Sequence, residues 1–309
     1  MNNYPIRLLL AMLAVLASAP IMAQDEAGFR PFVLASVNET ALEQQAAATI
    51  AALEGAGFNV AGQYAPLDNA RVIVVTSPEL LAVAARGERG GYGAAQRIGL
   101  AERDGKTEVA FVNPLYIQHA YRLDGDLQPV LDRLVGALGR VEDFGAKKGL
   151  SAKKLAKYHY MVGMQRFDDP SELGSFDSHA AAVAAVEQGL ARAGDALTQV
   201  YRIDIPGTQQ TLFGVGMQAV GATKDELAID SAHQLGIVDF EGPAKVAYLP
   251  YEILVDGSDV EALHMRFRMA VHFPDLSMMG DHGFTKLMAS PGATEDAFEA
   301  LLQTEGENE

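Results

Sequence analysis

The sequence lacks cysteine and tryptophan, and it is short of basic residues, with 24 Lys and Arg against 40 Asp and Glu. Without cysteine the chain forms no disulfide, thiolate nucleophile, Cys-ligated zinc site, iron–sulfur cluster or covalent c-type haem. A net charge of −16 argues against a nucleic-acid partner, because such proteins normally present a basic patch. The common catalytic signatures H-E-x-x-H, G-x-S-x-G and G-x-x-x-x-G-K-[ST] are absent as well, and so is an EF-hand loop.

Long apolar runs are confined to the N-terminus. Arg7 precedes an apolar stretch at residues 8–17, and residues 21–23 (Ile-Met-Ala) offer an acceptable pair of residues at positions −3 and −1 for cleavage after Ala23. This pattern predicts a signal peptide over residues 1–23. The stretch is shorter than the roughly 20 residues of a membrane span, so we expect no stable membrane insertion after cleavage. The sequence therefore predicts an exported bacterial protein, periplasmic or secreted, and a cysteine-free chain suits that oxidising compartment.

What the chain does contain is enough apolar material for a core (49% hydrophobic residues) and a length of about two average domains. Residues 24–142 form the first predicted domain. The predicted elements are a strand at 29–36, a helix opened by a capping box at 40–43, strands at 58–64 and 71–76, a short helix capped by Ser77, a hairpin of 96–102 and 107–113 turned by Asp104-Gly105, and a helix over 127–138.

Residues 158–302 repeat this order and form the second predicted domain. The predicted elements are a strand at 158–167, a helix built on Val183, Val186 and Leu190, strands at 200–205 and 211–219, a helix opened by a capping box at 223–226, a hairpin of 247–255 and 264–273, and a last helix at 297–302. Each copy is thus βαββαββα. We expect an α+β protein of two tandem sandwich repeats, with small, mainly antiparallel sheets covered by helices. A cleft between two such halves is a common ligand site.

Residues 143–157 join the two predicted domains and are rich in Gly, Ala and Lys, with five lysines. They are interpreted as a solvated linker, or alternatively as a docking patch for an anionic surface. Residues 303–309, with three glutamates, are expected to form a frayed acidic tail.

Residues 92–114 and 248–274 resemble the DUF302 family, also called TT1751-like. That family has a strand near a Leu-Pro pair, a glycine turn and a second strand that closes at a proline. The second copy matches better, through Leu249-Pro250 followed by an apolar strand and Gly257, whereas the first copy lacks the Leu-Pro pair. Tyr251 stands where the family often has cysteine, so a thiol-dependent role does not carry over. The resemblance implies two divergent copies of one fold and no assigned activity.

The candidate binding residues lie in residues 264–273. If this segment is a strand, alternation places its methionines and phenylalanines on the core side. The other face would then carry the cationic strip His264, Arg266, Arg268 and His272. In an acidic protein such a strip either pairs with a neighbouring carboxylate, for which Glu252 is the candidate, or binds an anionic ligand.

A metal or haem is a further alternative for the same region. His272, Met278, Met279 and His282 lie within eleven residues, and imidazole together with thioethers suits copper. Haem with a His or Met axial ligand is the second cofactor considered. The competing interpretation is that these methionines fill the core.

Three functions remain open from the sequence. The first is an exported binding module for a small molecule or a periplasmic protein. The second is a metal- or haem-associated redox or hydrolytic enzyme, with a His272/Glu252 pair as the metal-free variant. The third is a structural partner in a periplasmic complex, contacted through residues 147–157 or the acidic tail.

Overall fold

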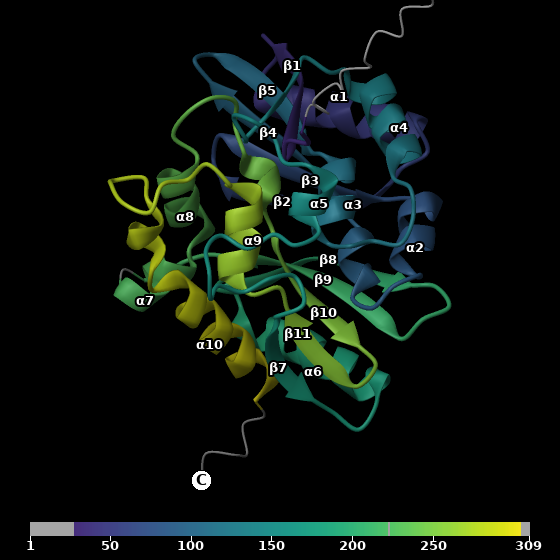
Figure 1. The fold of residues 1–309 in the computed structure, drawn as a ribbon, viewed down its shortest axis with the longest axis vertical. Coiled ribbons are helices and arrows are strands. Elements are labelled where there is room, and N and C mark those ends of the chain that lie inside the picture. The colour runs from purple at the N-terminus through teal and green to yellow at the C-terminus, as the bar shows by residue number, and fades with distance from the viewer. Residues whose placement is uncertain (1–27, 222, 304–309) are drawn as a thin grey trace, which may run out of the picture.

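A computed structural model describes residues 28–221 and 223–303. Within these residues the chain forms two antiparallel sheets, of six and five strands, together with ten α-helices (Figure 1). The α+β class is confirmed. The predicted signal peptide lies outside the described residues, and so does the predicted acidic tail after residue 303.

The first half follows the order expected from the sequence. Its elements are β1 (Phe32–Asn38), α1 (Leu42–Gly55), β2 (Asn59–Leu67), β3 (Ala70–Thr76), α2 (Pro78–Ala84), the 3₁₀ helix η1 (Gly90–Gly93), β4 (Gln96–Arg103), β5 (Lys106–Val112), α3 (Pro114–Ala120) and α4 (Gln128–Leu138). Two further elements, β6 (Glu142–Phe144) and α5 (Ala152–Leu155), follow in the segment interpreted as a linker. β6 pairs with β1 and extends the first sheet, so this segment is partly built into the fold.

The second half repeats that order. Its elements are β7 (Ser171–Ser175), α6 (His179–Ala193), β8 (Leu197–Ile205), β9 (Gln210–Met217), α7 (Lys224–Ile229), α8 (Ser231–Val238), η2 (Val246–Tyr248), β10 (Tyr251–Asp256), β11 (Asp259–Ala262), α9 (Met265–His272), η3 (Phe284–Leu287) and α10 (Ser290–Leu302). The strands run β2-β3-β4-β5-β1 in one sheet and β8-β9-β10-β11-β7 in the other, which is the same order. Two βαββαββα repeats are therefore present.

Local sequence signals account for several element ends. Ser77 caps α2 by accepting a hydrogen bond from the Leu80 amide, and Thr223 forms a full capping box with Glu226 at the start of α7. The β4–β5 hairpin turns at Asp104 and Gly105, whose φ angles of 52° and 72° are both positive. Such a pair of angles belongs to the two-residue hairpin turn that an Asp-Gly sequence favours.

Outside residues 264–273, three predictions were wrong. The capping box expected at residues 40–43 does not form, because α1 begins after Ala41 without a side-chain cap. Residues 158–167 are not a strand, and the first strand of the second half lies later, at β7. Their aromatic side chains instead anchor an irregular segment, with the Tyr158 and Tyr160 hydroxyls donating to the carbonyls of Ala270 and Leu276. The predicted strand 247–255 begins only at β10, after η2.

Each sheet has helices on one face and the other half of the molecule on the opposite face. α1 and α4 contact the first sheet, while α6 and α10 contact the second (Figure 1). Between the sheets the contacts are reciprocal: η1 packs against β9 and β10, and η2 packs against β3, β4 and β5. A glycine permits close approach at this interface, because a Cβ on Gly99 would lie 2.6 Å from the Ala247 amide nitrogen. The residues between the two halves are therefore the place to look for a site.

Candidate functional site

The segment that carries the predicted cationic strip is a helix, α9, and not the strand expected from its alternation. Apolar and polar residues alternate over 264–273, but Met265, Phe267, Arg268, Met269, Val271 and His272 are all buried. A helix buried on nearly every side has no polar face, so alternation cannot distinguish it from a strand. The four strip residues consequently do not share one face.

The helix separates the four strip residues into two groups. His264 caps α9, with its Nδ1 accepting from the Arg266 amide at 3.1 Å, and the Arg266 side chain is exposed. Burial lowers the pKa of His264, and the positive charge of Arg266 lowers it further. Arg268 and His272 lie one turn apart and point into the interior, where they are 1% and 0% exposed.

Arg268 and His272 belong to a buried network centred on Glu252 of β10. Arg97 of β4, in the first half, approaches Glu252 with 2.8 Å between Nη1 and Oε2. Arg268 Nε lies 3.7 Å from the same oxygen, and the Tyr201 hydroxyl donates to Oε1 at 2.8 Å. The network thus joins the two sheets, and it contains the Arg268–Glu252 ion pair that the sequence suggested. Arg97, which no motif marked, lies closer to Glu252 than Arg268 does.

His272 is held neutral inside this network. Its burial, reinforced by the positive charges of Arg97 and Arg268, moves its pKa well below the ordinary value. Its Nδ1 lies 2.8 Å from the Arg268 carbonyl oxygen, and its Nε2 lies 3.2 Å from Arg97 Nη2. The neutral ring satisfies both contacts by donating from Nδ1 and accepting at Nε2. Arg97 therefore stands between His272 and Glu252, the two residues considered as a catalytic pair.

Aromatic rings close the network on the remaining side. The Arg268 guanidinium lies over Tyr248 and Tyr251, with 4.4 Å to each ring centroid, and its Nη2 donates to the carbonyls of Tyr248 and Pro250. Tyr121 is also buried beside this network, and burial raises its pKa to about 12. The charges are thus sealed from solvent, which makes the network a junction between the halves and not an open binding surface.

The four metal-ligand candidates occupy different surroundings. His272 is in the interior with both ring nitrogens engaged. His282 is exposed, stacks on Phe240 with 4.1 Å between ring centroids, and has Nδ1 3.1 Å from the Ile237 carbonyl oxygen. Met279 is 73% exposed, and Met278 lines a separate apolar pocket. Residues 28–221 and 223–303 contain no group of three or more His, Asp or Glu side chains placed to hold a metal ion.

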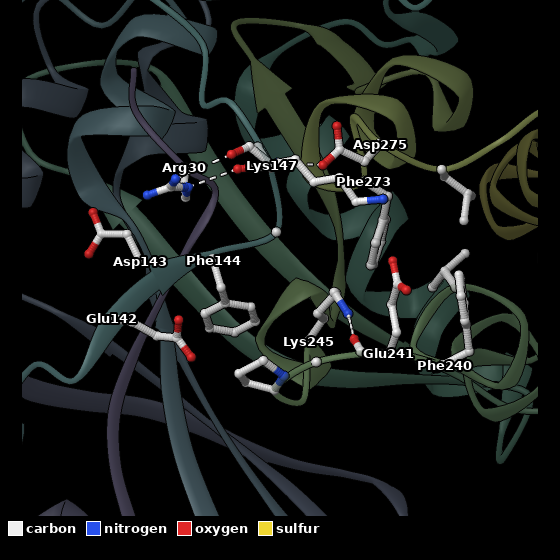
Figure 2. Close-up of a pocket in the computed structure, with 16 residues that line it drawn as sticks. Arg30, Glu142, Asp143, Phe144, Lys147, Phe240, Glu241, Lys245, Phe273 and Asp275 are labelled. Atoms are coloured by element: carbon white, nitrogen blue, oxygen red, sulfur yellow. Dashed lines mark hydrogen bonds between the residues drawn. The ribbon is translucent and has the colours of Figure 1, made fainter. Parts of the chain in front are cut away.

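An open cavity of about 560 Å³ lies between the two halves (Figure 2). The first half contributes Arg30 and residues 142–147, which include β6. The second half contributes residues of 238–245, between α8 and η2, and of 273–276, after α9. Phe144, Phe240 and Phe273 supply aromatic surface on both sides of the cavity. This volume falls in the range of small-molecule pockets.

Some charged groups of the cavity are already engaged by the protein. Arg30 donates to the carbonyls of Ala146 and Lys147, and an Asp275 carboxylate oxygen accepts from the Lys147 amide at 2.5 Å. Lys245 donates to the Glu241 carbonyl oxygen and lies 3.5 Å from Asp239. These contacts, visible in Figure 2 for the residues drawn there, fix the backbone on the two sides of the cavity.

Other charged groups of the cavity have no ionic partner. Among the described residues, the carboxylates of Glu142 and Glu241 and the ammonium of Lys147 form no ion pair. All three residues are exposed. In Figure 2 the Lys147 side chain extends toward Phe273. The cavity can therefore offer both signs of charge next to an aromatic surface.

Sequence reasoning did not assemble this cavity. Residues 143–147 lie in the segment interpreted as a linker, and the Glu241-Gly242-Pro243 turn carries no chemical motif. The only available signal was indirect: two similar halves leave a cleft where they meet.

No protein-family model, curated protein or solved structure matches this sequence. Within the part of the chain that the structure describes, no helix has the length and apolar composition needed to cross a membrane.

Proposed function

We propose that this protein is an exported binding module that holds a small ligand in the cavity between its two halves. The observation that carries the proposal is that both halves line one cavity of about 560 Å³. Residues 142–147, which include β6, lie on one side of it and residues of 238–245 on the other. A site built from two halves lets both grip one ligand, as is common where domains meet. The DUF302 resemblance and the predicted signal peptide agree with this proposal but assign no ligand.

The charges of the cavity suggest the class of ligand. Glu142 and Glu241 would receive an ammonium group, and Lys147 would receive a carboxylate. The three phenylalanines would cover apolar parts of the ligand. A free amino acid or a short peptide carries this combination of groups, and charge-assisted hydrogen bonds of this kind are the stronger ones in proteins.

The lining favours binding over catalysis. The described residues around the cavity include no serine, threonine, tyrosine or histidine, and the chain has no cysteine. A hydroxyl or thiol nucleophile activated by histidine therefore has no candidate in this lining.

The test combines native mass spectrometry with titration. The protein is purified from the periplasm of its own source to detect a bound mass, and it is then titrated calorimetrically with mixtures of the common amino acids and of dipeptides. We expect a bound mass or a saturable heat, with the affinity lowered about tenfold or more in Glu142→Gln, Glu241→Gln or Lys147→Met, because each removes a charged contact worth about 1.5–3 kcal/mol.

The control is Glu54→Gln, which alters an exposed carboxylate on α1 away from the cavity. We expect its affinity to equal that of the unaltered protein. Absence of any bound mass and of any heat with both mixtures would contradict the proposal, as would binding that none of the three cavity variants weakens.

A further inference from the structure

Five methionines line a second pocket, separate from the cavity between the halves. The pocket has a volume of about 160 Å³ and is bounded by α9, the irregular segment before β7, η3 and the start of α10. The methionines are Met164, Met265, Met269, Met278 and Met288. The remaining lining residues are Tyr160, Arg266, Phe284, Leu287 and Pro291. Five of the chain's 11 methionines therefore meet at one place.

The thioethers reach the pocket from both sides. Met265 and Met269 lie one turn apart on α9, and they are fixed in the core at 3% and 2% exposure. Met288, at 74% exposure, lies on the solvent side. Methionine is flexible and polarisable, and its sulfur makes favourable contacts with aromatic rings. Tyr160 and Phe284 already meet edge to face in the lining, with 4.5 Å between their centroids. Such a wall can adapt to a flat apolar ligand.

Two kinds of ligand suit a group of thioethers: a soft metal ion and an apolar or aromatic group. The charge of the lining separates them. Arg266 is the charged residue among the ten that line the pocket, and it forms no ion pair with any described residue. A guanidinium repels a metal cation and attracts a carboxylate, to which it can donate two parallel hydrogen bonds.

Two of the remaining polar and sulfur groups are already in use. The Tyr160 hydroxyl donates to the Leu276 carbonyl oxygen at 2.9 Å. The Met265 sulfur accepts from the Thr294 hydroxyl at 3.6 Å, which occupies one of its two lone pairs. The exposed Arg266 therefore provides the polar contact for a ligand, while the interior of the pocket is apolar.

We propose that this methionine pocket binds a small aromatic monocarboxylate, with its ring among the thioethers and its carboxylate on Arg266. The size agrees with a single ring, since an apolar cavity of about 150 Å³ in another protein holds benzene. The methionine pocket is separate from the cavity between the halves, because the two linings have no residue in common.

The experiment follows the methyl groups of methionine by NMR in protein labelled with ¹³C at those methyls, with benzoate as the probe. We expect benzoate to shift the signals of the five pocket methionines in a saturable way. The signals of Met161 and Met279, which are 45% and 73% exposed and do not line the pocket, should stay in place. Equal shifts at all exposed methionines, or no shifts at all, would overturn the proposal.

Two comparisons test the role of Arg266. Arg266→Gln should weaken benzoate binding about tenfold or more, and benzyl alcohol, which lacks the carboxylate, should bind the unaltered protein more weakly by a similar factor. The matched control is Arg86→Gln, an exposed arginine after α2, which should leave benzoate binding unchanged. Undiminished binding by Arg266→Gln would overturn the assignment of the carboxylate to Arg266.

A titration with Ag⁺, as a redox-inert stand-in for Cu⁺, tests the metal alternative directly. The proposal expects benzoate, and not Ag⁺, to bind at the pocket methyls. Saturable shifts with Ag⁺ together with no shifts with benzoate would replace the proposal with a soft-metal site.

Discussion

The two halves of the molecule meet at two charged regions that differ in their exposure to water. In the buried network, Arg97, Glu252, Arg268 and His272 are at most 4% exposed and are engaged with one another. In the open cavity, charged side chains such as Glu241 keep contact with solvent and lack an ionic partner among the described residues. Both regions draw residues from each half.

The difference shows how burial assigns separate roles within one interface. Removing a charge from water is costly, so a buried charge persists only where partners compensate it. In the Glu252 network the partners come from the protein itself: Arg97 and Arg268 both face the Glu252 carboxylate, and Arg268 also lies over two tyrosine rings. The network therefore ties the two sheets together. The cavity leaves its charges hydrated, which makes them available to a ligand. Of the four residues in the predicted cationic strip, Arg268 and His272 belong to the buried network.

The largest expected effect comes from removing the charge at the centre of the buried network. Glu252 is the carboxylate that Arg97 and Arg268 share, so Glu252→Gln leaves two buried guanidiniums without their counter-ion. We expect the free energy of unfolding to fall by about 3–5 kcal/mol. Arg97→Met should lower the free energy of unfolding by less, because the positive charge of Arg268 then still faces the negative charge of Glu252. Urea denaturation measures both values.

Glu241→Gln, in the open cavity, is the matched control for these variants. Its carboxylate is exposed, so the free energy of unfolding should change by no more than about 0.5 kcal/mol. Equal costs for Glu252→Gln and Glu241→Gln would remove the distinction between the two regions.

The close packing of the halves gives the next largest effect. In Gly99→Ala the added methyl would lie 2.5 Å from Val246 Cγ1 and 2.6 Å from the Ala247 amide nitrogen, so β4 and η2 would have to separate. We expect a loss of about 1–3 kcal/mol in denaturation experiments. Gly55→Ala, at the end of α1, meets nothing within 4 Å and should instead be neutral or stabilise by up to about 1 kcal/mol. The prediction fails if both alanines behave alike.

The smallest expected effect is a pH dependence that comes from His272. Its pKa in the folded state is lowered by burial and by the charges of Arg97 and Arg268, whereas the unfolded chain has an ordinary value near 6.5. Above that pH both states are neutral, and below it the unfolded state alone takes up the proton. His272 therefore lowers the free energy of unfolding, by up to about 1.4 kcal/mol per pH unit, as the pH falls below about 6.5.

Comparison of the unaltered protein with His272→Gln isolates this contribution. The stability difference between the two should shrink from pH 7.5 to pH 5. Parallel pH profiles for the unaltered protein and His272→Gln would show that His272 is not held neutral by its surroundings.

Much of the fold could be predicted because local signals were strong. Ser77 with Pro78 marked the start of α2, Asp104-Gly105 marked a hairpin, and the two series of elements showed the repeat. α9 was mispredicted because it is buried on nearly every side, which removes the periodicity that identifies a helix. The strand predicted at 158–167 failed because its aromatic residues pack onto α9 and the loop after it.

The candidate sites were less accessible to prediction. Glu252 and Arg268 were identified together, but Arg97 lies more than 150 residues away in the chain and no motif marks it. The residues around the cavity carry ordinary loop sequences. Of the methionines in the second pocket, the sequence placed Met265 and Met269 in the core and made Met278 a metal-ligand candidate, and only the folded chain gathers five of them.

The order of the elements in each half and most of the turns follow from local sequence, because they depend on contacts between near neighbours. Which charges are buried, which stay in contact with water and which methionines meet depends on the packing of the whole chain. Those outcomes depend on how one half packs against the other, and on the cost of removing each charge from water at its final position.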